Sequence, residues 1–148
     1  MMTIQITQHS PEFSTAPQIQ VEDVAEIAQL GFKTIINNRP DLEGGAEQPT
    51  SDQIKKAAEK LGLAYLYIPV VPNNIQANQI ADFSSAFALA AKPVLGFCRT
   101  GNRASTLYKF TQGDRNPVGM SPTKSLKQWL QTKCLITRLY KFCKAKLA

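Results

Sequence analysis

Short apolar segments alternate with amphipathic helical patterns along the first two thirds of the chain. The apolar segments lie at residues 32–37, 64–68 and 94–97, and the helical patterns lie at 21–30, 50–61 and 75–91. A further extended piece is expected within residues 13–19. Helices that alternate with buried strands at this spacing are typical of a mostly parallel sheet. The sequence therefore predicts a three-layer α/β fold, in which helices flank a central, mostly parallel sheet.

Polar loops follow each of the three predicted strands. Arg39 and Asp41 follow the first strand, residues 70–74 follow the second, and Cys98 follows the third. Parallel strands bring their carboxyl ends to one edge of the sheet, and ligands bind outside that edge in such folds. We therefore expect a binding site that is built from these three loops.

The segment 94–105 has the pattern of a strand, a tight loop and the start of a helix. Such a junction points backbone N–H groups and the positive end of the helix dipole into one site. Amides and neighbouring arginines would stabilise the thiolate of Cys98 there, and Arg103 could bind two oxygens of an oxyanion at once. The segment predicts a nucleophile in an anion-binding loop. The alternative is that Cys98 is an ordinary buried residue at a strand end.

The charge of the chain is unevenly distributed. The chain has 148 residues and a net charge of +6, and from Arg115 onward it contains eight Lys and Arg residues but no Asp or Glu. We expect one α/β domain over residues 1–112 and a basic helical tail over residues 113–148 that packs on it. Such a tail can bind a polyanion, for example a nucleic acid or an acidic lipid surface, or it can be the solvated face of terminal helices.

Cysteine and histidine usage indicates the compartment and the chemistry. Cys98, Cys134 and Cys143 cannot all pair within the chain, and neither an export signal nor a membrane-spanning apolar run is visible. These features predict a cytoplasmic protein with free thiols, in which Cys134 and Cys143 are buried core residues. The sole histidine, His9, has no second ligand at metal-binding spacing. We therefore expect neither a metal site nor a cofactor.

Three motifs resemble one known bacterial family. They lie at residues 32–41 (FKTIINNRPD), 67–70 (YIPV) and 97–103 (FCRTGNR). They are similar to the beta-lactamase-hydrolase-like, phosphatase-like domain, which is itself similar to dual-specificity protein phosphatases and is sometimes labelled a sulfur transferase. The likeness covers about residues 10 to 112. It implies a tyrosine-phosphatase-like fold and hydrolysis of a phosphorylated small molecule or phosphoprotein through a phosphocysteine intermediate.

The resemblance also implies roles for individual residues. Cys98 would be the nucleophile, and Arg103 would bind the oxyanion. Substrate phosphate would be bound by other residues of the phosphate-binding loop and by one arginine of a neighbouring loop, namely Arg99, Thr100, Gly101, Asn102, Ala104 and Arg39.

The motifs depart from the dual-specificity phosphatases at three places. One is Ala104, which stands where a hydroxyl residue often follows the arginine that binds the oxyanion. Four residues separate Cys98 from Arg103, where tyrosine phosphatases generally have five, and rhodaneses share the shorter spacing. Residues 70–74 contain no carboxylate, where dual-specificity phosphatases usually have an aspartic acid that protonates the leaving group. Asp41 is the expected substitute, with Glu43 and Glu47 as alternatives, although an aspartate here also suits a turn cap.

Two other functions are compatible with the sequence. A rhodanese-like sulfurtransferase carrying a Cys98 persulfide would need no general acid, because sulfur transfer has no alkoxide leaving group. A non-enzymatic anion-binding module would combine the same loop with the basic tail, and its phosphate contacts would make binding salt-dependent. The predicted function is the cysteine-dependent phosphatase.

Overall fold

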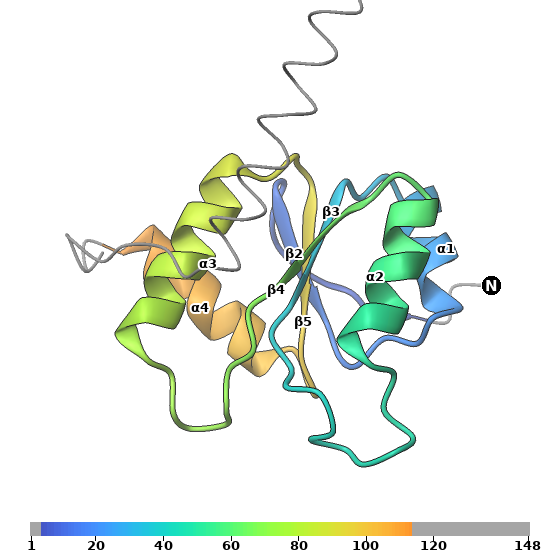
Figure 1. Cartoon of the computed structure of the whole chain (residues 1–148). Coiled ribbons are helices and arrows are strands. Elements are labelled where there is room, and N and C mark those ends of the chain that lie inside the picture. Colours follow the sequence, from blue (N-terminus) through green and yellow to red (C-terminus); the bar gives the residue numbers. More distant parts are fainter. Residues whose placement is uncertain (1–3, 114–148) are drawn as a thin grey trace, which may run out of the picture.

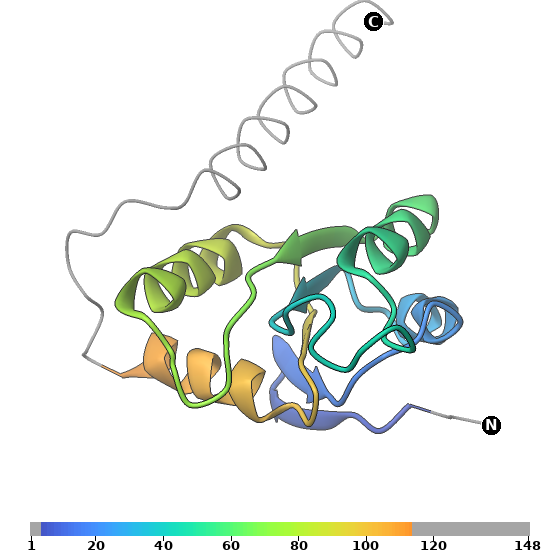
Figure 2. The same cartoon turned by 60° about the horizontal axis from the view of Figure 1, so that its bottom comes forward.

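The computed structural model describes residues 4–113, which form a five-stranded sheet between two pairs of helices. Helices α1 and α2 cover one face of the sheet, and α3 and α4 cover the other (Figures 1 and 2). In chain order the elements are β1 (Thr7–Ser10), β2 (Phe13–Ala16), α1 (Asp23–Gln29), β3 (Thr34–Asn37), α2 (Ser51–Lys60), β4 (Ala64–Tyr67), α3 (Ala77–Leu89), β5 (Val94–Phe97) and α4 (Asn102–Gln112).

The strand order is β1-β2-β5-β3-β4. The β1–β2 pair is antiparallel, and the pairs β2–β5, β5–β3 and β3–β4 are parallel. The predicted three-layer α/β fold with a mostly parallel sheet is therefore confirmed. Helices α1, α2 and α3 are one or two residues shorter at each end than their sequence patterns predict. Strand β1 is not visible in the hydrophobic pattern, because it is an edge strand whose four residues are polar and mostly exposed.

The core has one apolar cluster on each face of the sheet. Successive strand residues alternate between them: Ile36 and Val94 pack in the cluster that includes α3 and α4, and Ile35 and Leu95 pack in the cluster that includes α1 and α2. All four of these side chains are fully buried. A strand that is buried on both faces has a continuous apolar sequence, and for this reason β3 and β5 are predictable from the sequence.

Gly96 allows helix α4 to lie close to strand β5. A Cβ atom at this position would come within 2.9 Å of Phe13 Cζ and 3.1 Å of Ala104 Cβ. Contacts this short would force side chains or backbone to shift. The glycine therefore fixes where the first turn of α4 sits relative to the end of β5, and this junction contains Cys98.

Several predictions lie outside the described residues. They are the basic tail over residues 113–148 and its binding of a polyanion, and the burial of Cys134 and Cys143. Within residues 4–113, no helix has both the length and the apolar character needed to cross a membrane.

Candidate active site

Four strand ends meet at one end of the sheet. The Asn38 N–H donates to the Phe97 carbonyl at 2.8 Å and the Val70 N–H donates to the Asn38 carbonyl at 3.1 Å, which ties together the residues that follow β3, β4 and β5. The Gln18 N–H donates to the Arg99 carbonyl at 3.2 Å, which connects the segment after β2 to the same group of loops. The loops that the sequence places at the carboxyl ends of the strands are therefore in contact.

The Cys98 loop (residues 98–103) folds around the sulfur of its first residue. Cys98 is 1% exposed, and the Gly101 N–H donates to its Sγ at 3.1 Å. Gly101 has a φ of 88°, is the N-cap of α4 and makes no side-chain capping bond. N–H groups in the first turn of a helix have no partner within the helix. The amides at the start of α4, together with the positive end of its dipole, can therefore bind an anion beside Cys98.

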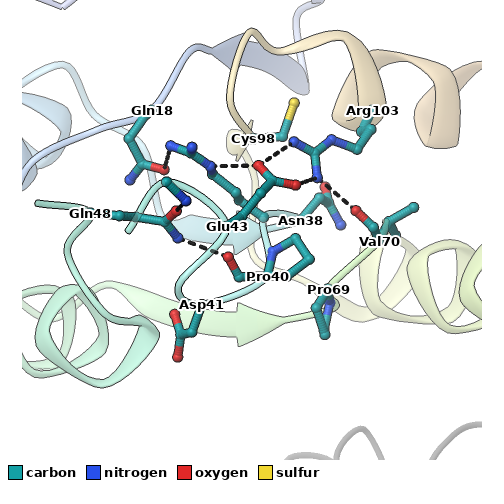
Figure 3. Close-up of polar contacts among 12 residues, drawn as sticks. Gln18, Asn38, Pro40, Asp41, Glu43, Gln48, Pro69, Val70, Cys98 and Arg103 are labelled. Atoms are coloured by element: carbon teal, nitrogen blue, oxygen red, sulfur yellow. Dashed lines mark hydrogen bonds and ion pairs between the residues drawn. The ribbon is translucent and has the colours of Figure 1, made fainter. Parts of the chain in front are cut away.

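The guanidinium of Arg103 is held at its distal end. Nη1 donates to Glu43 Oε1 at 2.7 Å and to the Val70 carbonyl at 2.7 Å, and Nη2 donates to Glu43 Oε2 at 2.9 Å. Figure 3 shows these three contacts on the side of the guanidinium that faces the Glu43 loop and Val70. The Arg103 side chain is only 10% exposed, so the contacts fix the plane of the guanidinium.

The opposite edge of this guanidinium faces Cys98. The Nε–H and the second Nη2–H of Arg103 are not used in the contacts with Glu43 and Val70, and Figure 3 shows Cys98 Sγ on that side. This pair of parallel donors suits two oxygens of one oxyanion. Burial opposes the charge of Arg103, but the hydrogen bonds to Glu43 and the charges of Cys98 and Glu43 outweigh it and raise the pKa of Arg103.

Glu43 joins two arginines. Besides its two bonds with Arg103, Glu43 Oε2 accepts from Arg39 Nε at 2.7 Å, and Arg39 Nη1 donates to Gln18 Oε1 at 2.9 Å. The hydrogen bonds from Arg103 lower the pKa of Glu43 against the opposing effect of burial, and those from Arg39 lower it further. Glu43 is therefore an ionised acceptor that positions both arginines.

The β3–α2 loop (residues 38–50) places Glu43 over the Cys98 loop. The Gln48 side chain closes the loop, because its Oε1 accepts from the Gly44 N–H at 2.8 Å and its Nε2 donates to the Pro40 carbonyl at 2.8 Å. A Cβ at Gly44 would lie 2.6 Å from Arg39 Nη2. Leu42 has a φ of 65°, a left-handed conformation that is unfavourable for leucine. Tertiary contacts therefore determine the shape of this loop.

Asp41 lies in the same loop but points away from Cys98 (Figure 3). Its Oδ1 accepts from the Ser51 N–H at 2.7 Å, at the start of α2, and its own N–H donates to Tyr67 Oη at 2.9 Å. Asp41 therefore binds a backbone N–H at the start of α2, where Thr50 is the N-cap. Of the three acids predicted to be candidates, only Glu43 contacts Arg103. Glu47 is exposed.

The remaining predicted residues fall into three groups. Arg99, Thr100 and Asn102 are exposed on the Cys98 loop, and Ala104 is buried behind it. Arg39 is 8% exposed and is connected to Arg103 through Glu43. The sequence therefore identifies residues that do lie together, although the part that each plays in binding stays a prediction.

Residues 5–114 match a family described as Beta-lactamase hydrolase-like protein, phosphatase-like domain. The chain belongs to this family. The family predicted from the three motifs is therefore confirmed. A curated relative, the Beta-lactamase hydrolase-like protein of Agrobacterium fabrum, is 41% identical over 93 residues, which are 63% of this chain and 21% of that protein. The chain spans about a fifth of the length of the curated relatives that it matches.

Solved structures have the same fold as this phosphatase-like domain. A Neisseria meningitidis protein assigned provisionally to the phosphatases is 38% identical, with a TM-score of 0.64 over 76% of this chain and 77% of that one. The active form of Tk-PTP is 16% identical, with a TM-score of 0.52 over 86% of this chain and 94% of that one, and it shows the fold alone. The predicted tyrosine-phosphatase-like fold is therefore confirmed.

Sequence reasoning missed several parts of the phosphatase-like site. Gln18 and Gln48 are unremarkable polar residues in sequence, and the Val70 carbonyl has no sequence signal. Glu43 is predicted only as an alternative proton donor and not as the acceptor for two arginines. Glu43 follows Arg39 by four residues, and in a helix this spacing would favour an ion pair. Here the pair forms in a loop, where the spacing in sequence does not predict it.

Replacing Glu43 with glutamine is expected to lower the free energy of unfolding by about 2 kcal/mol at pH 7, because both arginines lose a charged acceptor. The fold lowers the pKa of Glu43 from its ordinary value of about 4.3. The advantage of the wild type is therefore fully present above that ordinary value and is lost as the pH falls through the lowered pKa. Urea unfolding of both proteins between pH 7 and pH 3 measures this difference.

The matched control is Glu47→Gln, which removes an exposed carboxylate from the same loop. It is expected to leave the free energy of unfolding unchanged at each pH. If the free energies of unfolding of the wild type and Glu43→Gln differ by the same amount at pH 7 and pH 3, the assignment of Glu43 as an ionised acceptor is contradicted.

Proposed function

We propose that this domain is a cysteine-dependent phosphatase that hydrolyses a phosphomonoester or related phosphoryl compound through a phosphocysteine intermediate. The observation that carries the proposal is the arrangement around Cys98 Sγ. The Gly101 N–H at the start of α4 donates to this sulfur, and the Nε–Nη2 edge of Arg103 lies on the same side as the sulfur. A phosphoryl group bound there has two sets of donors for its oxygens and a sulfur in position for attack.

The proposed reaction has two steps. In the first, the Cys98 thiolate attacks phosphorus, a P–S bond forms, and the P–O bond to the leaving group breaks with its electron pair on that oxygen. In the second, water attacks phosphorus, the P–S bond breaks, and inorganic phosphate and the thiolate are released, with the proton of the water passing to phosphate or solvent. Arg103 stabilises the negative charge on the phosphoryl oxygens in both steps.

A rhodanese-like sulfurtransferase is the second candidate. The short spacing from Cys98 to Arg103 supports it, and so does the engagement of Asp41 and Glu43 elsewhere, because transfer of sulfur from a Cys98 persulfide needs no proton donor. The same anion-binding groups would then bind thiosulfate.

A side-by-side assay separates the two functions. If the domain is a phosphatase, we expect steady hydrolysis of p-nitrophenyl phosphate and no formation of thiocyanate from thiosulfate and cyanide. Thiocyanate formation without phosphate release, together with one added sulfur atom on Cys98 by intact mass, would overturn it in favour of the sulfurtransferase.

A further inference from the structure

The structure constrains how a leaving group can depart from this site, and the inference rests on the proposed phosphatase function. Departure of an alcohol from phosphorus needs a protonated acid beside the leaving oxygen, because an alkoxide is strongly basic. The phosphatase-like domain has eleven acidic residues, and ten of them lie within residues 4–113. Their positions can therefore be compared with that requirement.

Glu43 and Asp41, two carboxylates of the β3–α2 loop, are both engaged by other groups. Glu43 is ion-paired with Arg103 and Arg39 at 2.7 Å each, and Asp41 accepts from the backbone at the start of α2. The ion pairs lower the pKa of Glu43, so Glu43 is a poor proton donor at neutral pH. The Asp41 carboxylate points away from Cys98 (Figure 3). The loop between β4 and α3 (residues 68–76) contributes the Val70 carbonyl to Arg103 and contains no acidic residue.

The residue that follows Cys98 is an exposed cation. Arg99 follows Cys98 directly, its side chain is exposed, and it makes no ion pair within the described part of the chain. Its backbone is fixed, because its carbonyl accepts from the Gln18 N–H. Arg103, by contrast, already has Glu43 as a counter-ion. An exposed guanidinium on the Cys98 loop is therefore available to an anionic group of a bound substrate.

We propose that the preferred substrates are phosphoanhydrides, in which Cys98 accepts the terminal phosphoryl group of a diphosphate and Arg99 binds the departing phosphate. The thiolate forms a P–S bond while the P–O bond of the anhydride breaks, and the leaving phosphate keeps the electron pair without taking a proton. A phosphate monoester has a second pKa of about 6, whereas the phenol of tyrosine has a pKa of about 10. The anhydride therefore needs no general acid, and its leaving group carries the charge that Arg99 can bind.

The test compares leaving groups and matched variants. Hydrolysis of inorganic pyrophosphate, a nucleoside diphosphate, p-nitrophenyl phosphate and glycerol phosphate is measured for the full chain. We expect kcat/KM for a diphosphate to exceed that for glycerol phosphate by at least about 10²-fold, the range that a general acid otherwise supplies. Arg99→Ala is expected to lower kcat/KM for the diphosphates by about tenfold and to change hydrolysis of p-nitrophenyl phosphate much less.

Lys109→Ala is the matched control, because Lys109 is an exposed cation in the last turn of α4. Its loss should change kcat/KM neither for the diphosphates nor for p-nitrophenyl phosphate. Similar kcat/KM values for glycerol phosphate and the diphosphates, or a loss of glycerol phosphate hydrolysis in Glu47→Gln, would overturn the inference while the phosphatase proposal stands. Hydrolysis of p-nitrophenyl phosphate without cleavage of either diphosphate would do the same. Failure to hydrolyse any of the four compounds, or hydrolysis that persists in Cys98→Ser, would overturn the phosphatase proposal itself.

Discussion

Replacing Cys98 with serine is expected to lower kcat for p-nitrophenyl phosphate by at least about 10⁴-fold, which is the scale of losing a covalent nucleophile. The hydroxyl is similar in size to the thiol, so the hydrogen bond from the Gly101 N–H can persist. A serine hydroxyl is ionised far less than a thiol at neutral pH and is therefore a much weaker nucleophile. The loss is therefore expected in kcat, while KM changes little, because the anion-binding groups are unchanged.

The chain contains its own controls for this variant. Cys134→Ser and Cys143→Ser remove the other two thiols and are expected to retain full activity. Thermal unfolding of all three variants shows whether the fold is intact. Activity that survives in Cys98→Ser, or that disappears in one of the controls, would contradict the assignment of the nucleophile.

The second large effect is expected for Arg103→Lys, with a fall in kcat on the order of 10²- to 10³-fold. Lysine keeps the positive charge but cannot offer two parallel donors to one oxyanion. The ammonium would also compete for Glu43 and the Val70 carbonyl, which the guanidinium contacts with its distal end. Steady-state kinetics on p-nitrophenyl phosphate measure the loss.

Arg99→Lys is the matched control for this substitution, because it makes the same chemical change one residue after the nucleophile, on an exposed side chain. It is expected to leave kcat for p-nitrophenyl phosphate within about threefold of the wild type. The role proposed for Arg99 is to bind the departing phosphate of a diphosphate, and p-nitrophenolate has no phosphate group for it to bind. An Arg103→Lys enzyme with nearly normal kcat would show that bidentate binding of the oxyanion does not stabilise the transition state.

The fold was predictable where burial leaves a strong pattern. Strands β3 and β5 are apolar on both faces, and Ile35 and Ile36 pack into different clusters, so their sequence is continuously hydrophobic. Strand β1 pairs with β2 at the edge of the sheet, and its side chains are mostly exposed. It therefore leaves no hydrophobic signal, although its backbone makes the same kind of hydrogen bonds.

The site was predictable where its parts are local in sequence. Cys98, Gly101 and Arg103 lie within six residues, and the chemistry of each side chain indicates an anion-binding loop. Glu43 lies 60 residues from its partner Arg103. Choosing it over Asp41 requires knowing the left-handed conformation of Leu42 and the bonds of Gln48 across the loop. These features depend on tertiary structure, so the sequence leaves the acids of this loop indistinguishable.

The most direct test of the account is to trap the intermediate on Cys98. Wild-type protein is mixed with a phosphoryl donor labelled at the transferred phosphorus, quenched in acid within milliseconds, digested and mapped by mass spectrometry. We expect labelled phosphate on the peptide that contains Cys98 and none in Cys98→Ser. Turnover of the donor with no phosphate on Cys98 at any quench time, or with the label on another residue, would contradict it.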